Sequence, residues 1–152
     1  MKPITLEWVA KAEGDFRSAQ REVRVTDLPN YDLVCFLSQQ CAEKYLKARL
    51  VEASVDFPKI HNLIALLKLV VAVEPHLTKL QPELAALNPY GVEFRYPGDR
   101  ASLADAKSAF TRCCVARSAV RRCLGLDEPP SAQMKLQIKE RRVRYKAQRK
   151  RK

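Results

Sequence analysis

The chain is poor in residues that interrupt helices. Its 152 residues include only 4 glycines, and three of its 9 prolines (Pro3, Pro129 and Pro130) fall outside the segments that show helical periodicity. Because glycine and proline are the main local breakers of regular structure, their scarcity favours long helices over short strands joined by turns. With 47% hydrophobic residues, the chain can bury one core, and we expect no second globular domain.

Metal-ligand spacing is also missing. The five cysteines contain no CxxC pair, and only His61 and His76 are available to join them. We therefore predict no metal site and no cofactor, and we interpret the cysteines as small buried thiols in a reducing compartment.

Signals for secretion, membrane insertion and several enzyme classes are absent as well. The segment MKPITLEWVAKAEGDF has no uninterrupted apolar stretch, and no later run approaches the roughly 18 apolar residues that span a bilayer. We expect a cytoplasmic protein without a membrane partner. The sequence has no glycine-rich phosphate loop, no Ser/His/Asp set and no pair of carboxylates at catalytic spacing, so it gives no support to those enzyme classes.

Positive charge is concentrated at one end of the chain. The net charge is +11, yet residues 131–152 hold ten of the 28 basic residues and one acid, which leaves only +2 for the rest. We therefore divide the chain into a helical bundle at 1–126 and a linker with a basic tail at 127–152. The tail residues expected to contact nucleic acid are Lys139, Arg141, Arg142, Arg144, Lys146 and Arg149.

Apolar residues recur at helical spacing in four long segments, at about 5–24, 30–53, 61–74 and 102–125. Thr5 and Asn30 are predicted N-caps, and Gly125 is a predicted left-handed terminator. A short extra helix is predicted at 76–87. Short connections between these segments indicate an all-α fold, an antiparallel up-and-down four-helix bundle with one short extra helix. The second segment has a broad apolar stripe, which we interpret as a surface for two neighbours or for a partner protein.

A polar strip interrupts that second helix, where Gln39 and Gln40 precede Lys44 and Lys47. One interpretation is a cationic wall that binds phosphate or RNA. The other is an ordinary solvent-facing side, which the i, i+4 pair of Glu43 and Lys47 favours.

His61 opens the third predicted helix, and Lys59 lies two residues before it. Unpaired amides and the helix dipole make a helix N-terminus favourable for anions, and they bias a histidine there towards the neutral form that a general base needs. In the alternative interpretation, His61 only caps its own helix.

The loop NPYGVEFRYPG at 88–98 interleaves aromatic and charged residues. Arg95 can clamp a phosphate while Tyr96 stacks on a base, because a guanidinium is a bidentate donor and the ring offers a π-face. In the alternative interpretation, the aromatic side chains close the end of the bundle and Arg95 pairs with Glu93 or Asp99.

The pattern QQxAEKxLK, followed by a proline-containing turn, a histidine and an Arg-Tyr-Pro element, resembles the HEPN family of small α-helical domains. The pattern residues are Gln39, Gln40, Ala42, Glu43, Lys44, Leu46 and Lys47. Members of that family are linked to nucleotide and RNA chemistry and are often encoded beside a nucleotidyltransferase. The resemblance implies a homodimer that works with a nucleotidyltransferase-type protein in a toxin–antitoxin-like pair. The chemistry of the strip, the helix start and the loop described above makes Lys44, Lys47, Lys59, His61, Arg95 and Tyr96 the candidate nucleotide- or RNA-binding residues.

The chain departs from the ribonucleases of that family in one respect. They typically carry an arginine followed four to six residues later by histidine, whereas the nearest arginine before His61 is Arg49, twelve residues away. His76 has no arginine at that spacing either. This absence favours a protein that is not itself an enzyme.

Three functions remain open on the sequence. The first is a nucleotide- or RNA-associated module with a protein partner. The second is an RNA-cleaving toxin with His61 as base and Arg95 or Lys59 stabilising the phosphorane. The third is a nucleic-acid-binding protein whose affinity comes from the basic tail.

Overall fold

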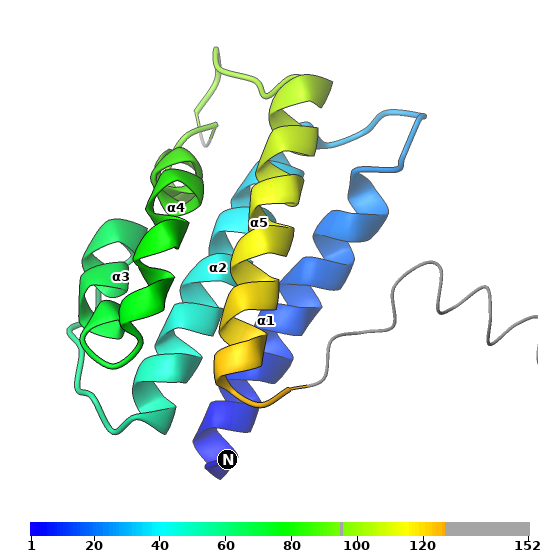
Figure 1. The fold of residues 1–152 in the computed structure, drawn as a ribbon. Helices are drawn as coiled ribbons and strands as arrows, with labels where there is room; N and C mark the ends of the chain where they lie inside the picture. The colour runs from blue at the N-terminus through cyan, green and yellow to red at the C-terminus, as the bar shows by residue number, and fades with distance from the viewer. Residues whose placement is uncertain (95, 127–152) are drawn as a thin grey trace, which may run out of the picture.

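The computed structural model describes residues 1–94 and 96–126, and all regular structure within them is helical (Figure 1). This confirms the all-α prediction. Arg95 and the basic tail, with all of its predicted nucleic-acid contacts, lie outside the described residues. The elements are α1 (Pro3–Glu22), α2 (Tyr31–Glu52), α3 (Leu63–Val71), the 3-10 helix η1 (Pro75–Leu80), α4 (Gln81–Leu87), the 3-10 helix η2 (Asn88–Gly91) and α5 (Leu103–Cys123).

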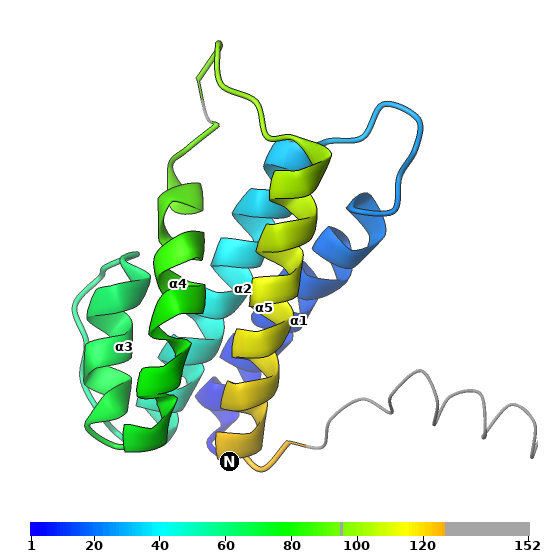
Figure 2. The ribbon, with the colours of Figure 1, turned by 45° about the horizontal axis from the view of Figure 1, so that its top comes forward.

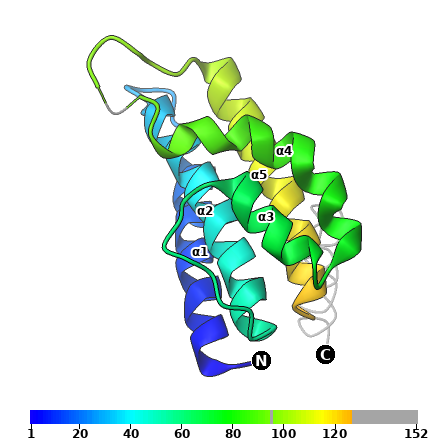
Figure 3. The same cartoon turned by 90° about the vertical axis from the view of Figure 1, so that its left-hand side faces the viewer.

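The helices alternate in direction, as a bundle of this kind requires. In Figures 1 and 2, α1 rises from the N-terminus, α2 returns, the η1–α4 segment rises and α5 returns beside it. The chain climbs through residues 53–62 before α3 begins, so α3 runs parallel to α2 and packs on it, on the side away from α1 (Figure 3). The third arm is therefore the η1–α4 segment, which coincides with the short extra helix predicted at 76–87. The long helix predicted at 61–74 is shorter in the structure: α3 has nine residues and is the additional helix beside the four arms.

Helix boundaries follow capping chemistry at most of the predicted positions. Asn30 accepts a hydrogen bond from the Leu33 amide at 3.0 Å and caps α2. Ser102 and Asp105 form a reciprocal capping box at the start of α5. Gly125 has φ of +66°, a left-handed conformation that glycine adopts without strain, and ends the same helix.

The predicted cap at Thr5 is wrong. The N-cap of α1 is Lys2, three residues earlier, and Pro3 lies in the first turn of the helix, where the missing N–H of proline costs nothing. The Thr5 hydroxyl instead donates to Glu52 Oε2 at 2.7 Å, so it ties the start of α1 to the end of α2.

Helix α2 is the centre of the core. Neighbouring helices α1, α3 and α5 pack on it, and twelve of its residues are buried, among them Tyr45, Leu46 and Leu50. Most of its broad apolar stripe is therefore used within one chain, while Leu33, near the start of the helix, stays 38% exposed. None of the helices in the described residues has the length and apolar character needed to cross a membrane.

Candidate functional site

Three polar side chains of α2 are buried in a row. Gln39, Glu43 and Lys47 are spaced by four residues, lie on one face of the helix and are no more than 6% exposed. This burial overturns the solvent-facing interpretation of the strip for these residues. Charged groups this far from water are stable only when they are paired and hydrogen-bonded, so the row has to form its own network.

Glu43 is the centre of that network. Its Oε1 accepts from Lys47 Nζ at 2.8 Å and contacts His61 Nδ1 at 2.9 Å. Its Oε2 accepts from Gln39 Nε2 at 3.2 Å and from Gln40 Nε2 at 3.4 Å. A carboxylate paired with lysine only accepts, so the proton of a neutral His61 lies on Nδ1. The opposite ring nitrogen, Nε2, is left with its lone pair for a ligand.

His61 lies one residue before the cap of α3, and it does not open the helix as predicted. Asn62 is the N-cap and accepts from the amides of Ile64 and Ala65, both at 3.0 Å. The Leu63 amide donates to Asn88 Oδ1 at 2.8 Å. The first amides of α3 are thus already bonded and do not form an anion site, and His61 is not the cap. Its backbone carbonyl accepts from Gln39 Nε2 at 3.2 Å, which fixes the residue to α2.

A pocket of about 390 Å³ lies in front of this histidine, with polar and apolar walls. It is lined by Phe36, Gln40, His61, Asn62, Asn88, Gly91 and Val92. The η2 turn approaches α2 so closely that a Cβ at Gly91 would lie 3.3 Å from Gln39 Nε2. The pattern around residues 39–47 and the NPYG motif, far apart in sequence, therefore meet at one pocket.

Among the described residues, the others predicted to bind nucleotide or RNA do not line the pocket at His61. Lys44 is paired with Asp15 and Lys47 with Glu43, so neither ammonium is presented as part of an open cationic wall. Lys59 and Tyr96 are exposed. Arg95 lies outside the described residues, and the pairing of His61 with Arg95 stays a prediction.

The aromatic side chains of the 88–98 loop divide between two environments. Tyr90 stacks on Phe94 with ring centroids 5.8 Å apart, and both rings pack against the core. Burial raises the pKa of Tyr90 above its ordinary value, with smaller contributions from Cys35 and Asp105. Tyr96 is 79% exposed. The first two rings thus pack as the bundle-closing interpretation expects, and only Tyr96 presents its ring to solvent.

A second buried ionic network was missed at the sequence level. Arg117 on α5 donates to Glu13 on α1 through Nε at 2.6 Å and Nη2 at 2.9 Å, and the Tyr45 hydroxyl donates to the same carboxylate. Burial pushes the pKa of Glu13 up, but the hydrogen bonds from Arg117 and Tyr45 outweigh it and hold the pKa below its ordinary value. This network joins three helices, and we assign it to stability.

The cysteines have the character that their spacing predicts. Cys35, Cys41 and Cys113 are buried, and Cys114 and Cys123 are half-buried. Burial, helped by Asp105 and Asp32, raises the pKa of Cys35 to about 12, so it remains a thiol at neutral pH. Cys123, however, lies beside His76 and Glu74, a grouping that its distance in sequence from those residues concealed.

Comparison with known proteins agrees with the fold and with the motif. The family model of the HEPN domain matches residues 5–122. The crystal structure of an archaeal HEPN homologue is similar to this chain with a TM-score of 0.60 at 22% identity, over 80% of this chain and 97% of that one. No curated protein sequence matches the chain. The family match covers most of the chain, including α2, His61 and the pocket, and the chain therefore belongs to the HEPN domain family.

Proposed function

We propose that the chain is a nucleotide- or RNA-binding HEPN module whose binding site is the pocket at His61. One observation carries the proposal: the buried Glu43 carboxylate holds the Nδ1 edge of an imidazole whose side chain is 77% exposed. The carboxylate fixes the ring and its tautomer, so Nε2 is presented in one orientation to whatever enters the pocket. A fixed acceptor of this kind suits a ribose hydroxyl or another O–H or N–H donor.

The pocket lining fits a nucleotide in size and chemistry. Its volume of about 390 Å³ lies within the range of small-molecule sites, about 300–1,000 Å³. Phe36 and Val92 offer apolar surface for a base, while the amide of Gln40 and the histidine offer polar contacts for a sugar. Lys59 is exposed two residues before His61 and supplies a positive charge for a phosphate.

The proposal extends to protein partners. We propose a homodimer and a nucleotidyltransferase-type partner, as the family resemblance implies, in a toxin–antitoxin-like pair. Support comes from large apolar side chains exposed near α2 and the 88–98 loop, namely Leu33, Val92 and Tyr96 at 38%, 66% and 79%. Light scattering of the purified chain tests the homodimer, and co-purification with the product of the neighbouring gene tests the second partner.

The Glu43–His61 contact also favours a second candidate function, an RNA-cleaving enzyme. A histidine that receives a carboxylate at Nδ1 and presents Nε2 has the arrangement of a general base. Incubation of the purified chain with RNA decides this candidate, since an enzyme leaves shortened product and a binding module leaves the RNA intact.

The binding function is tested with the full chain, a fluorescent single-stranded RNA and ATP. His61→Ala should weaken binding of at least one of the two ligands by about two- to tenfold, because it removes a hydrogen bond between neutral groups, worth about 0.5–1.5 kcal/mol. Lys68→Ala, an exposed change on α3 outside the pocket, is the matched control and should bind as the unaltered chain does. Equal affinities for both variants would refute the proposed site.

The histidine tautomer gives an independent reading of the geometry. Nitrogen chemical shifts of the neutral form of His61 should place the proton on Nδ1. A proton on Nε2 would contradict the proposed orientation, whatever the binding assay shows.

A further inference from the structure

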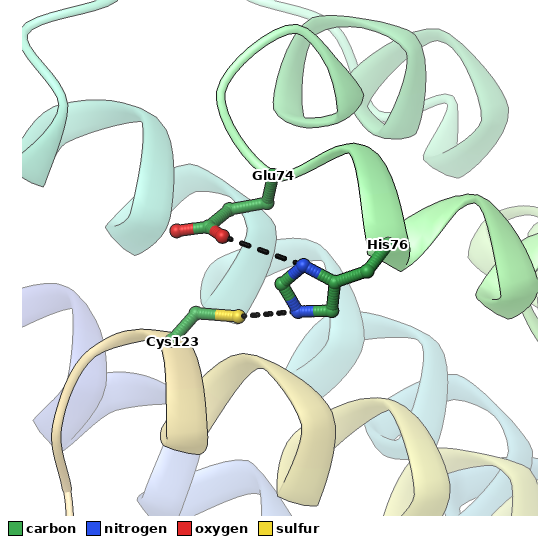
Figure 4. A group of neighbouring side chains, drawn as sticks. All are labelled: Glu74, His76 and Cys123. Atoms are coloured by element: carbon green, nitrogen blue, oxygen red, sulfur yellow. Dashed lines mark hydrogen bonds and ion pairs between the residues drawn. The ribbon is translucent and has the colours of Figure 1, made fainter.

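At the far end of α3 from the pocket, three ligating side chains of different chemistry converge (Figure 4). Glu74 precedes η1, His76 lies in its first turn, and Cys123 is the last residue of α5. His76 Nε2 lies 3.5 Å from Cys123 Sγ, and His76 Nδ1 lies 3.6 Å from Glu74 Oε2. Among the described residues, which include every histidine and cysteine of the chain, this is the one group of three such side chains.

The distances fit a tetrahedral metal centre. With a Zn–S bond of about 2.3 Å and a Zn–N bond of about 2.0 Å, the two ligand atoms of a tetrahedron lie about 3.5 Å apart. The observed separation of Nε2 and Sγ is 3.5 Å. One ligand atom from each of the three residues lies within 4.8 Å of the others. Glu74 Oε2 contacts the ring through Nδ1, so the carboxylate has to move towards Nε2 and Sγ to complete the arrangement.

We propose that Glu74, His76 and Cys123 form a binding site for a divalent zinc ion. The set of one thiolate, one imidazole and one carboxylate matches the borderline-soft character of Zn²⁺, whereas Mg²⁺ and Ca²⁺ prefer oxygen ligands alone. The two anionic ligands balance the charge of the ion. A water molecule fills the fourth position, since the His76 side chain is 57% exposed and the site is open to solvent.

Arg49 supplies the supporting contact that metal ligands commonly have. It donates to Glu74 Oε1 through Nε at 2.9 Å and Nη2 at 2.7 Å. Both bonds use the same oxygen, so Oε2 is left on the side of His76. Arg49 thus holds the carboxylate beside His76 while leaving Oε2 without a bond to the guanidinium.

The ordinary alternative is a hydrogen bond between the Cys123 thiol and His76, without metal. In that arrangement the Cys123 S–H group and His76 Nε2 lie 3.5 Å apart, within the distance of a sulfur hydrogen bond. Zinc binding then exchanges the S–H bond for an S–Zn bond and releases one proton to water, with no change of oxidation state. The bound ion links the start of η1 to the end of α5, across 47 residues of sequence.

The full chain, stripped of metal and kept reduced, is titrated with Co²⁺, which reports thiolate ligation by a charge-transfer band in the near ultraviolet. We expect one Co²⁺ per chain with that band, and its displacement by Zn²⁺. Cys123→Ser should abolish the band, and His76→Ala should weaken affinity at least about tenfold, the loss that even a supporting residue gives. Cys114→Ser is the matched control, a half-buried cysteine on the same helix, and should keep the band and the affinity.

Three results would overturn the proposal: Co²⁺ binding without a thiolate band, unchanged affinity in Cys123→Ser, or loss of the band in Cys114→Ser. Circular dichroism of each variant checks folding, and His76→Ala, at an exposed position, decides the matter if the cysteine variant does not fold. The RNA and ATP assays of the His61 pocket use a different site, so either proposal can fail without the other.

Discussion

Glu43→Gln tests the claim that charge holds the buried row of α2 together. Glutamine keeps the volume of the side chain, so the change removes the charge and leaves no cavity. It leaves the Lys47 ammonium, 6% exposed and 5.7 Å from the ring centroid of Trp8, without an opposite charge. Removing one partner of a buried ion pair costs about 3–5 kcal/mol. With a urea m-value of about 2 kcal/mol/M, the unfolding midpoint should fall by about 2 M.

A second variant separates the charge from the packing. Glu43→Gln combined with Lys47→Met removes both charges, and we expect it to recover most of the lost stability because no buried charge remains. Glu83→Gln is the control, since its partner Arg112 is 36% exposed and such pairs contribute about 0–1 kcal/mol. Urea unfolding followed by circular dichroism measures all three. If Glu43→Gln costs no more than the control, the charge of Lys47 reaches water and the reasoning fails.

Three further predictions concern other parts of the chain. The pKa of Glu13 is held below its unfolded value, so the stabilisation from its carboxylate is present above about pH 4.3 and is lost as the pH falls through the folded pKa. Glu13→Gln should therefore flatten the decline of the unfolding free energy below about pH 4.3, measured by urea unfolding. An unchanged decline would contradict this. A variant ending at Pro130 should bind duplex DNA weakly and with little salt dependence. If about six tail cations meet phosphates, the full chain should show a slope of log K against log salt concentration of roughly −5. Equal slopes would mean that the tail takes no part in binding. Gly91→Ala should lower the stability of the fold by about 1 kcal/mol in thermal unfolding, because its Cβ would lie 3.3 Å from Gln39. Gly14→Ala, whose Cβ would have nothing within 4 Å, should raise the stability by about 0.5–1 kcal/mol. Similar shifts for both variants would contradict the close approach at Gly91.

Local chemistry let several parts of the fold be predicted from the sequence. Asn30 carries a side-chain oxygen that caps a helix within three residues, and Gly125 tolerates the left-handed conformation that ends one. The apolar periodicity gave the extents of α2 and α5 to within a few residues. These features depend on neighbours close along the chain, so no tertiary information is needed to predict them.

The error at Thr5 shows where local chemistry is insufficient. Threonine is a good N-cap, but its hydroxyl donates to Glu52, 47 residues away, and α1 begins at Pro3. Helix α3 begins after His61. Asn62 caps the helix, and the amide of Gln39 holds the His61 carbonyl. A partner distant in sequence therefore explains the role of Thr5, whereas the start of α3 follows from the local cap at Asn62.

The sequence by itself determined the family, the helical class and the presence of the motif from Gln39 to Lys47, because these depend on residue types at fixed spacing. Only the tertiary structure decided that Lys47 is buried on Glu43, that Glu43 reaches His61, and that His76 meets Cys123. The physical reason is that burial is a property of what packs against a helix face. The sequence pattern of a polar residue at helical spacing is the same whether the residue faces water or is covered by a neighbouring helix.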